Sequence, residues 1–141
     1  MVVSNRLHNT IMKKDMILNN YENTKRRGAV GLGVAIAYFT KLGHIVSIPL
    51  NDSQDYDLIV DDGDKLKKIQ VKTVNCKSNG HYKVELRTHT SRGRTKDFST
   101  NSSDYIFILT EEGIIYLIPT NCLSVKTAIT LTKKYAEYIV N

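Results

Sequence analysis

Hydrophobic positions along residues 23–42 recur at intervals of three and four, which is the spacing of one face of an α-helix. Asn23 or Thr24 can cap the start of this predicted helix, and Gly43 can form its left-handed end. The expected apolar stripe consists of Val30, Val34, Ala37, Tyr38 and Leu42. The pattern therefore predicts one long helix that lays this stripe on other elements.

Three glycines, Gly28, Gly31 and Gly33, interrupt this helical pattern. A glycine inside a helix costs up to about 1 kcal/mol relative to alanine. A phosphate-binding glycine loop follows a strand, and none is evident before this segment. The glycines are therefore interpreted as places where the helix approaches a sheet closely.

After residue 43 the pattern changes to short apolar runs rich in β-branched residues, which are typical of strands. Predicted strands cover residues 44–50, 56–60, 67–74, 81–88, 104–110 and 114–119. Asp61–Asp64 reads as a hairpin turn, residues 91–103 as a loop, and residues 124–138 as a final helix that Ser124 caps. We expect an N-terminal arm or short helix over residues 1–22 and one domain over residues 23–141.

The composition of the 141 residues fits a globular chain, with 41% hydrophobic and 24% charged residues. No apolar stretch is long enough for a membrane span, and the N-terminus lacks the features of a secretory signal. Cys76 and Cys122 stand too far apart for a metal knuckle and suit a reducing cytoplasm, so we expect a cytoplasmic protein. The net charge of +6 and the pI of about 9.3 favour an acidic partner, nucleic acid first.

The charges are also separated along the chain. Bases gather at Lys25–Arg27 and between Lys83 and Lys96, whereas six acids crowd into one stretch: Asp52, Asp55, Asp57, Asp61, Asp62 and Asp64. This separation suggests a metal held in one place and a phosphate backbone around it.

Three polar side chains on the predicted hairpin form a candidate site. Gln70 and Lys72 share one face of their strand because side chains alternate, and the turn can bring Asp57 beside them. Asp57, the Gln70 side chain and the backbone carbonyl of Val71 offer the oxygen ligands that Mg²⁺ prefers, and a lysine beside them can position the attacking water. Spacing alone also leaves a purely structural alternative open, in which Lys72 extends to solvent and Asp57 caps a turn.

The stretch GAVGLGVAIAYFTKLGHIVSIPLNDSQDYDLIV, followed by KKIQVKT, resembles the PD-(D/E)XK nuclease superfamily. Asp57 matches the motif aspartate, Gln70 takes the place of the second acid, and Lys72 matches the lysine. The Gln-x-Lys form is similar to the branch that includes a cyanobacterial group I intron homing endonuclease, over about residues 24 to 120. The resemblance implies a restriction-endonuclease-like α/β fold, a mixed central sheet flanked by helices, and a DNA endonuclease that uses Mg²⁺ or Mn²⁺.

This chain departs from the superfamily pattern at two places. The expected acid on the first helix is replaced by Gly31-Leu32-Gly33, and Gln70 is neutral. Glu22, Asp52, Asp55 or a second subunit could supply the missing charge. A catalytically silent DNA-binding module, an RNA-processing nuclease and a Holliday-junction-resolving nuclease therefore remain as alternatives.

Two basic segments are candidates for DNA binding. One lies in the predicted loop and the other at the start of the first helix: Arg92, Arg94 and Lys96, and Lys25, Arg26 and Arg27. The alternative for the predicted loop is that it is only an exposed, soluble surface segment that binds no DNA. The predicted partner is double-stranded DNA, and because cutting a duplex needs two active sites, we expect a homodimer or homotetramer.

Overall fold

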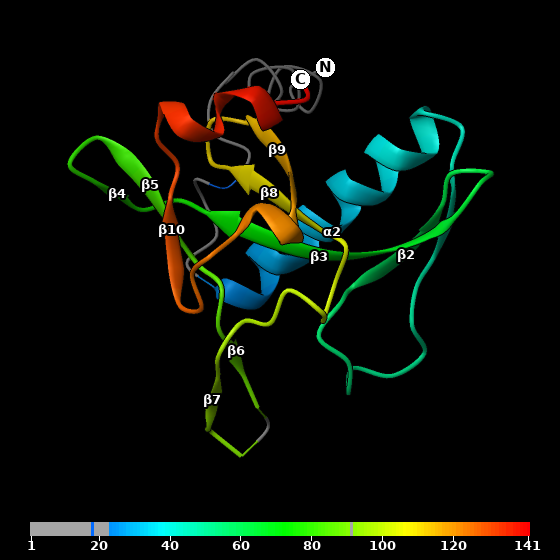
Figure 1. The fold of residues 1–141 in the computed structure, drawn as a ribbon, viewed down its shortest axis with the longest axis horizontal. Helices are drawn as coiled ribbons and strands as arrows, with labels where there is room; N and C mark the ends of the chain where they lie inside the picture. Colours follow the sequence, from blue (N-terminus) through cyan, green and yellow to red (C-terminus); the bar gives the residue numbers. More distant parts are fainter. Residues whose placement is uncertain (1–17, 19–22, 91) are drawn as a thin grey trace, which may run out of the picture.

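A five-stranded mixed sheet forms the centre of the fold in the computed structural model (Figure 1). Its order is β1-β2-β3-β8-β9, in which β3 and β8 are parallel and the other neighbours antiparallel. The strands are β1 (Ile45–Ser47), β2 (Leu58–Asp61), β3 (Leu66–Val74), β8 (Tyr105–Thr110) and β9 (Ile115–Pro119). The α/β fold with a mixed sheet is thus confirmed. The structure describes residues 18, 23–90 and 92–141, so the predicted arm over residues 1–22 lies outside the described residues, apart from Leu18.

Helix α2 (Thr24–Lys41) covers one face of this sheet. Asn23 caps it by accepting a hydrogen bond from the Lys25 backbone N–H at 2.9 Å, and Gly43 follows its end with φ +84°. The predicted apolar stripe is shifted by about one position, because the buried residues of the helix are Gly31, Ala35 and Phe39. Leu42, expected in the stripe, is 54% exposed. Among the described residues, no helix has the length and hydropathy that crossing a membrane requires.

Gly31 alone of the three helix glycines lies against the sheet. A Cβ at this position would overlap Thr73 Cγ2 and lie 3.4 Å from Val71 Cγ1, whereas Gly28 and Gly33 have open space around them. The close-packing interpretation is confirmed at Gly31 and wrong at the other two. The glycine sets how closely α2 can approach β3, which carries the candidate site.

We expect Gly31→Leu to lower the free energy of unfolding by about 1–3 kcal/mol, because the larger side chain must push α2 away from β3. Gly33→Ala is the matched control in the same helix, and it should raise stability by about 0.5–1 kcal/mol because only the helix propensity changes. Urea unfolding followed by circular dichroism measures both. A Gly31→Leu protein as stable as the wild type would contradict the close approach.

A small second sheet covers the opposite face of the central sheet. It has the order β10-β5-β4 and consists of β4 (Lys77–Ser78), β5 (His81–Glu85) and β10 (Ala128–Thr130). Tyr82, Val84 and Leu86 point into the core between the two sheets, as their alternation predicted. The two faces of β8 divide accordingly, with Phe107 on the α2 side and Ile106 on the β5 side.

The predicted final helix over residues 124–138 is wrong. Residues Ala128–Thr130 instead pair with β5, after the short turn η1 (Thr120–Cys122), and a 3-10 helix, η2 (Lys133–Tyr138), follows. β-branched residues dominate this stretch and favour a strand, and Leu131 N–H donates to Tyr82 O at 2.8 Å. The apolar residues that suggested a helix are in part buried all the same, as Leu131 and Tyr135 are.

The predicted loop between β5 and β8 contains a hairpin that the sequence pattern did not indicate. Strands β6 (Thr88–His89) and β7 (Thr95–Lys96) pair antiparallel and project from the body as a short arm (Figure 1). The buried side chains of Leu86 and Phe98 fix the two ends of this arm in the core. A segment with no buried positions between these anchors gives no periodic signal, which explains why it read as a loop.

Two residues of the acidic stretch, Asp61 and Asp62, stabilise a turn. Asp61 Oδ1 accepts from Gly63 N–H at 2.9 Å, and Asp62 Oδ1 accepts from the N–H groups of Asp64 and Lys65 at 2.9 and 2.8 Å. These hydrogen bonds to the carboxylate lower the pKa of Asp62. Asp61 and Asp62 therefore stabilise the β2–β3 turn, at the opposite end of the hairpin from Asp57.

Candidate active site

Asp57 lies immediately before β2, where that strand separates from β3. Its backbone N–H donates to Ile69 O at 2.9 Å, and its carboxylate Oδ2 accepts from Val71 N–H at 2.7 Å. These two bonds extend the β2–β3 pairing by one step and fix the carboxylate beside the middle of β3. Asp57 is therefore not merely a turn cap, because its hydrogen-bond partner Val71 lies on the central strand of the sheet.

Gln70 and Lys72 share the face of β3 that looks toward β5, as the alternation predicted. The regular pairing ends at Leu58 and Ile69, and Asp57 then bonds to Ile69 O and to Val71 N–H, so it lies beside Gln70 and acts electrostatically on Lys72. The structure thus brings Asp57, Gln70 and Lys72 together. Lys72 is half-buried on an interior strand, so it is no edge lysine that merely extends to solvent.

The charge of Lys72 is held in a half-buried place, whereas Asp57 keeps one side exposed to solvent. Desolvation raises the pKa of Asp57, against the lowering effects of the Val71 N–H bond and of Lys72. Desolvation likewise lowers the pKa of Lys72, opposed by the carboxylates of Asp57, Glu85 and Asp55. Each pKa shift favours the neutral form of its side chain. The attraction between the Asp57 carboxylate and the Lys72 ammonium offsets part of the desolvation cost of both charges. Such paired, opposed shifts are typical of functional sites.

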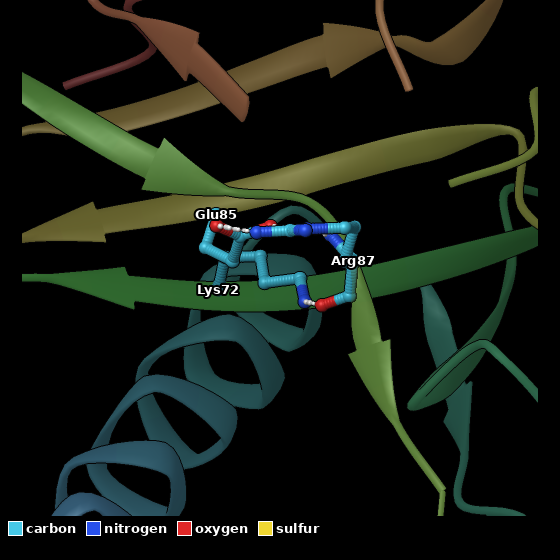
Figure 2. Close-up of polar contacts among 3 residues, drawn as sticks. All are labelled: Lys72, Glu85 and Arg87. Carbon is cyan, nitrogen blue, oxygen red and sulfur yellow. Dashed lines mark hydrogen bonds and ion pairs between the residues drawn. The ribbon is translucent and has the colours of Figure 1, made fainter. Parts of the chain in front are cut away.

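Glu85 and Arg87 belong to the surroundings of Lys72, although no sequence pattern pointed to them. Lys72 Nζ donates to Arg87 O at 3.4 Å, and the Arg87 guanidinium binds both carboxylate oxygens of Glu85, at 2.6 and 3.1 Å (Figure 2). This ion pair lowers the pKa of Glu85. Alternation placed Glu85 and Arg87 on the outer face of β5, and only the crossing of β5 over β3 brings them to Lys72.

The oxygen atoms beside Lys72 fit a hard divalent cation. Gln70 is 4% exposed, and its Oε1 atom has no hydrogen-bond partner among the described residues. A buried carbonyl oxygen without a donor is costly unless a ligand satisfies it. The N–H and C=O groups of one strand residue point to the same side of the strand. The Val71 N–H donates to Asp57, so the Val71 carbonyl also points toward Asp57. Asp57, Gln70 and the Val71 carbonyl are the donor set predicted from the sequence.

The described residues place no second acidic ligand beside Asp57 in the donor set. No group of three His, Cys, Asp or Glu side chains lies close enough to hold a metal within the part of the chain that the structure describes. Of the acids suggested to replace the missing helix residue, Asp55 acts on Lys72 electrostatically but is paired with Lys96, and Glu22 lies outside the described residues. Asp52 is exposed.

The two basic segments lie in different places. Arg92, Arg94 and Lys96 are exposed on the β6–β7 arm, whose base is next to Lys72 through Arg87. Lys25, Arg26 and Arg27 occupy the first turn of α2, on the other face of the sheet from Lys72. The arm therefore lies next to the candidate site, whereas the basic residues of α2 lie on the opposite face of the central sheet.

The carboxylate, amide and lysine on adjoining strands of a mixed sheet define a nuclease of the PD-(D/E)XK class. The sequence matches the PD-(D/E)XK endonuclease family over residues 22–138, and the chain belongs to this family. Among solved structures, it is similar to the bacterial homing endonuclease I-Ssp6803I, with 27% identity and a TM-score of 0.71 over 83% of this chain and 88% of that one. The expected superfamily and its homing-endonuclease likeness are thereby confirmed.

A second solved structure, that of MepB, matches at 15% identity with a TM-score of 0.49, over 77% of this chain and 95% of that one. A comparison with curated proteins gave no match.

Proposed function

We propose that this nuclease is a metal-dependent DNA endonuclease of the homing type. The observation that carries the proposal is the unsatisfied Gln70 Oε1 atom between Asp57 and Lys72. A purely structural cluster would pair this buried oxygen with a donor, whereas a cation site leaves it free for its ligand. The similarity to I-Ssp6803I supports DNA as the substrate and homing as the type of activity.

The protein side chains take separate roles in phosphodiester hydrolysis. Asp57, Gln70 and the Val71 carbonyl would hold Mg²⁺ or Mn²⁺, which when bound polarises a phosphate oxygen and lowers the pKa of water. Lys72 lies beside this donor set with a pKa that desolvation lowers. Its amino group orients the attacking water and stabilises the negative charge that develops on the phosphate. The Val71 N–H bond keeps the Asp57 carboxylate in place throughout.

Basic side chains hold the DNA around this centre. Arg92 and Arg94 on the arm provide the main contacts, and Lys96 at the base of the arm, which is paired with Asp55, adds a further positive charge. Lys25, Arg26 and Arg27 extend the basic surface at the start of α2. Contacts of this kind release counterions from the DNA, so binding should weaken steeply with salt.

A homodimer or homotetramer supplies the two active sites that cutting both strands requires. Apolar side chains on and near the edge strand β1 support self-association, because the second sheet leaves them uncovered. Ile45 and Leu66 flank Asp61 in one row across β1, β2 and β3, at 68% exposure each, and Leu50 is fully exposed. Light scattering on the purified protein measures the assembly.

Supercoiled plasmid carrying a library of inserted sequences tests the proposed activity. We expect nicking and linearisation with Mg²⁺ or Mn²⁺ and none with EDTA, because the donor set consists of oxygen atoms. RNA and four-way junctions serve as competing substrates that separate the alternatives. Duplex binding that is indifferent to metal, with no cleavage of any substrate, would replace the proposal with a catalytically silent DNA-binding module. The absence of a cluster of acidic ligands around Asp57 among the described residues is what favours that second candidate.

A further inference from the structure

The β6–β7 arm has the shape of a two-stranded ribbon that can enter a DNA groove. Thr88 pairs with Lys96 and His89 with Thr95, and the Thr90 N–H donates to Arg94 O at 2.8 Å. Three residues on each side at about 3.3 Å per residue give roughly 10 Å of ribbon. The major groove of B-DNA is about 12 Å wide and 8.5 Å deep and admits such a ribbon.

The arm is held firmly enough to present side chains in a defined place. Leu86 and Phe98 are buried at its two ends, and the backbone N–H groups of these residues donate to Thr127 O and Lys126 O at 2.7 and 2.9 Å. Gly93 closes the tip with φ +72°, and its N–H donates to Thr90 O at 2.9 Å. Both ends of the arm are therefore anchored in the core.

The cationic side chains of the arm differ in what they already bind. Arg87 at the base is paired with Glu85, and Lys96 with Asp55. Within the described part of the chain, Arg92 and Arg94 have no ion-pair partner. The two arginines nearest the tip are thus the ones free to bind a ligand, while Lys96 joins the base of the arm to the segment before β2.

The register also orients the arm toward the nuclease site. Cross-strand partners share a face, and so do residues two apart, so Lys96 and Arg94 lie on the same face of the ribbon. Lys96 contacts Asp55, two residues before Asp57. Arg94 therefore lies on the face that looks toward the nuclease site.

We propose that the β6–β7 arm enters the major groove of the DNA and that Arg92 and Arg94 read guanine edges there. An arginine fork matches the O6 and N7 acceptors of guanine, which is the commonest specific contact to a base. The segment from Arg87 to Lys96 contains no acidic residue that would repel the groove. This inference rests on the proposed function and deepens it, because it assigns the arm to sequence recognition beside the scissile phosphate.

Selection of bound duplexes from a randomised library tests this role, with EDTA present so that no DNA is cut. The wild-type protein should enrich a motif that contains guanine. Arg92→Lys and Arg94→Lys keep the charge but lose the fork, so each should lose the preference at its own base pair, with about tenfold weaker binding to the selected site. Lys133→Ala on η2, at the opposite end of the molecule, is the control and should keep the motif.

Replacement of each selected guanine by 7-deazaguanine then identifies the groove, because only the major-groove N7 acceptor is lost. We expect one or two such positions to weaken wild-type binding, and the corresponding lysine variant to be indifferent to the replacement. The inference is overturned if the wild type enriches no motif, if both variants keep the wild-type motif, or if 7-deazaguanine has no effect at any position. A variant-sensitive motif without metal-dependent cleavage would instead overturn the proposed nuclease function and leave the arm's role intact.

Discussion

Lys72→Ala is expected to reduce plasmid cleavage by at least about 100-fold, the lower end of what a positioned proton-transferring group contributes. Lys72 is the cationic side chain that shares the face of β3 with Gln70 and lies next to Asp57. The fold should survive, because the amino group makes one long hydrogen bond, to Arg87 O at 3.4 Å, and its charge is desolvated. The measurement is the rate of loss of supercoiled plasmid at saturating metal.

The matched control is Lys65→Ala, which removes an equal charge from the exposed turn of the same hairpin. Its rate should stay within about twofold of the wild type, because surface charges on this turn are screened by solvent and salt. A Lys72→Ala protein that cleaves as fast as the control would remove Lys72 from the site. Circular dichroism and duplex binding establish that the inactive variant is folded.

Asp57→Asn is expected to abolish metal-dependent cleavage and at the same time to stabilise the fold at neutral pH. The asparagine side-chain oxygen can still accept the Val71 N–H bond, but it no longer offers a carboxylate to the metal. Desolvation raises the pKa of Asp57, so the ionised side chain destabilises the native state at pH 7. A neutral side chain of the same shape removes that cost.

The gain in stability should depend on pH with a definite sign. The folded pKa of Asp57 lies above its unfolded value of 3.8, so native Asp57 binds its proton first as the pH falls. The cost is therefore fully present above the folded pKa and disappears as the pH falls through it. Urea unfolding without metal should show Asp57→Asn as more stable than the wild type at pH 7, with the difference shrinking as the pH falls through the folded pKa of Asp57. A variant less stable than the wild type at pH 7 would contradict the desolvated carboxylate.

The catalytic strand and its neighbours could be predicted from the sequence because local signals coincide there. Alternation along β3, the turn residues before it and the β-branched runs fix both the register and the shared face of Gln70 and Lys72. The prediction for residues 124–138 was wrong because local and tertiary signals disagree there. The apolar spacing suited a helix, whereas pairing with β5 favoured a strand. Tertiary pairing overrides local pattern in such short segments.

Glu85 and Arg87 mark the limit of sequence reasoning about the site. Their side chains stay partly exposed, and it is the backbone carbonyl of Arg87, just after β5, that accepts the hydrogen bond from Lys72. The unsatisfied oxygen of Gln70 likewise depends on what surrounds it in space. The candidate ligands were predicted from residue type and spacing, whereas the residues that surround them could not be predicted in this way.

The parallel pairing of β3 with β8 has a consequence for how such enzymes diversify. Parallel neighbours require a long crossover connection, and here the crossover spans residues 75–104 and carries both the second sheet's β4 and β5 and the β6–β7 arm. The ends of this connection are fixed by β3 and β8, so the arm can lengthen, shorten or change composition while the register of Gln70 and Lys72 stays constant. In the recognition role proposed for the arm, mutations of this appendage would alter the target site of a descendant while the arrangement of Asp57, Gln70 and Lys72 stays unchanged.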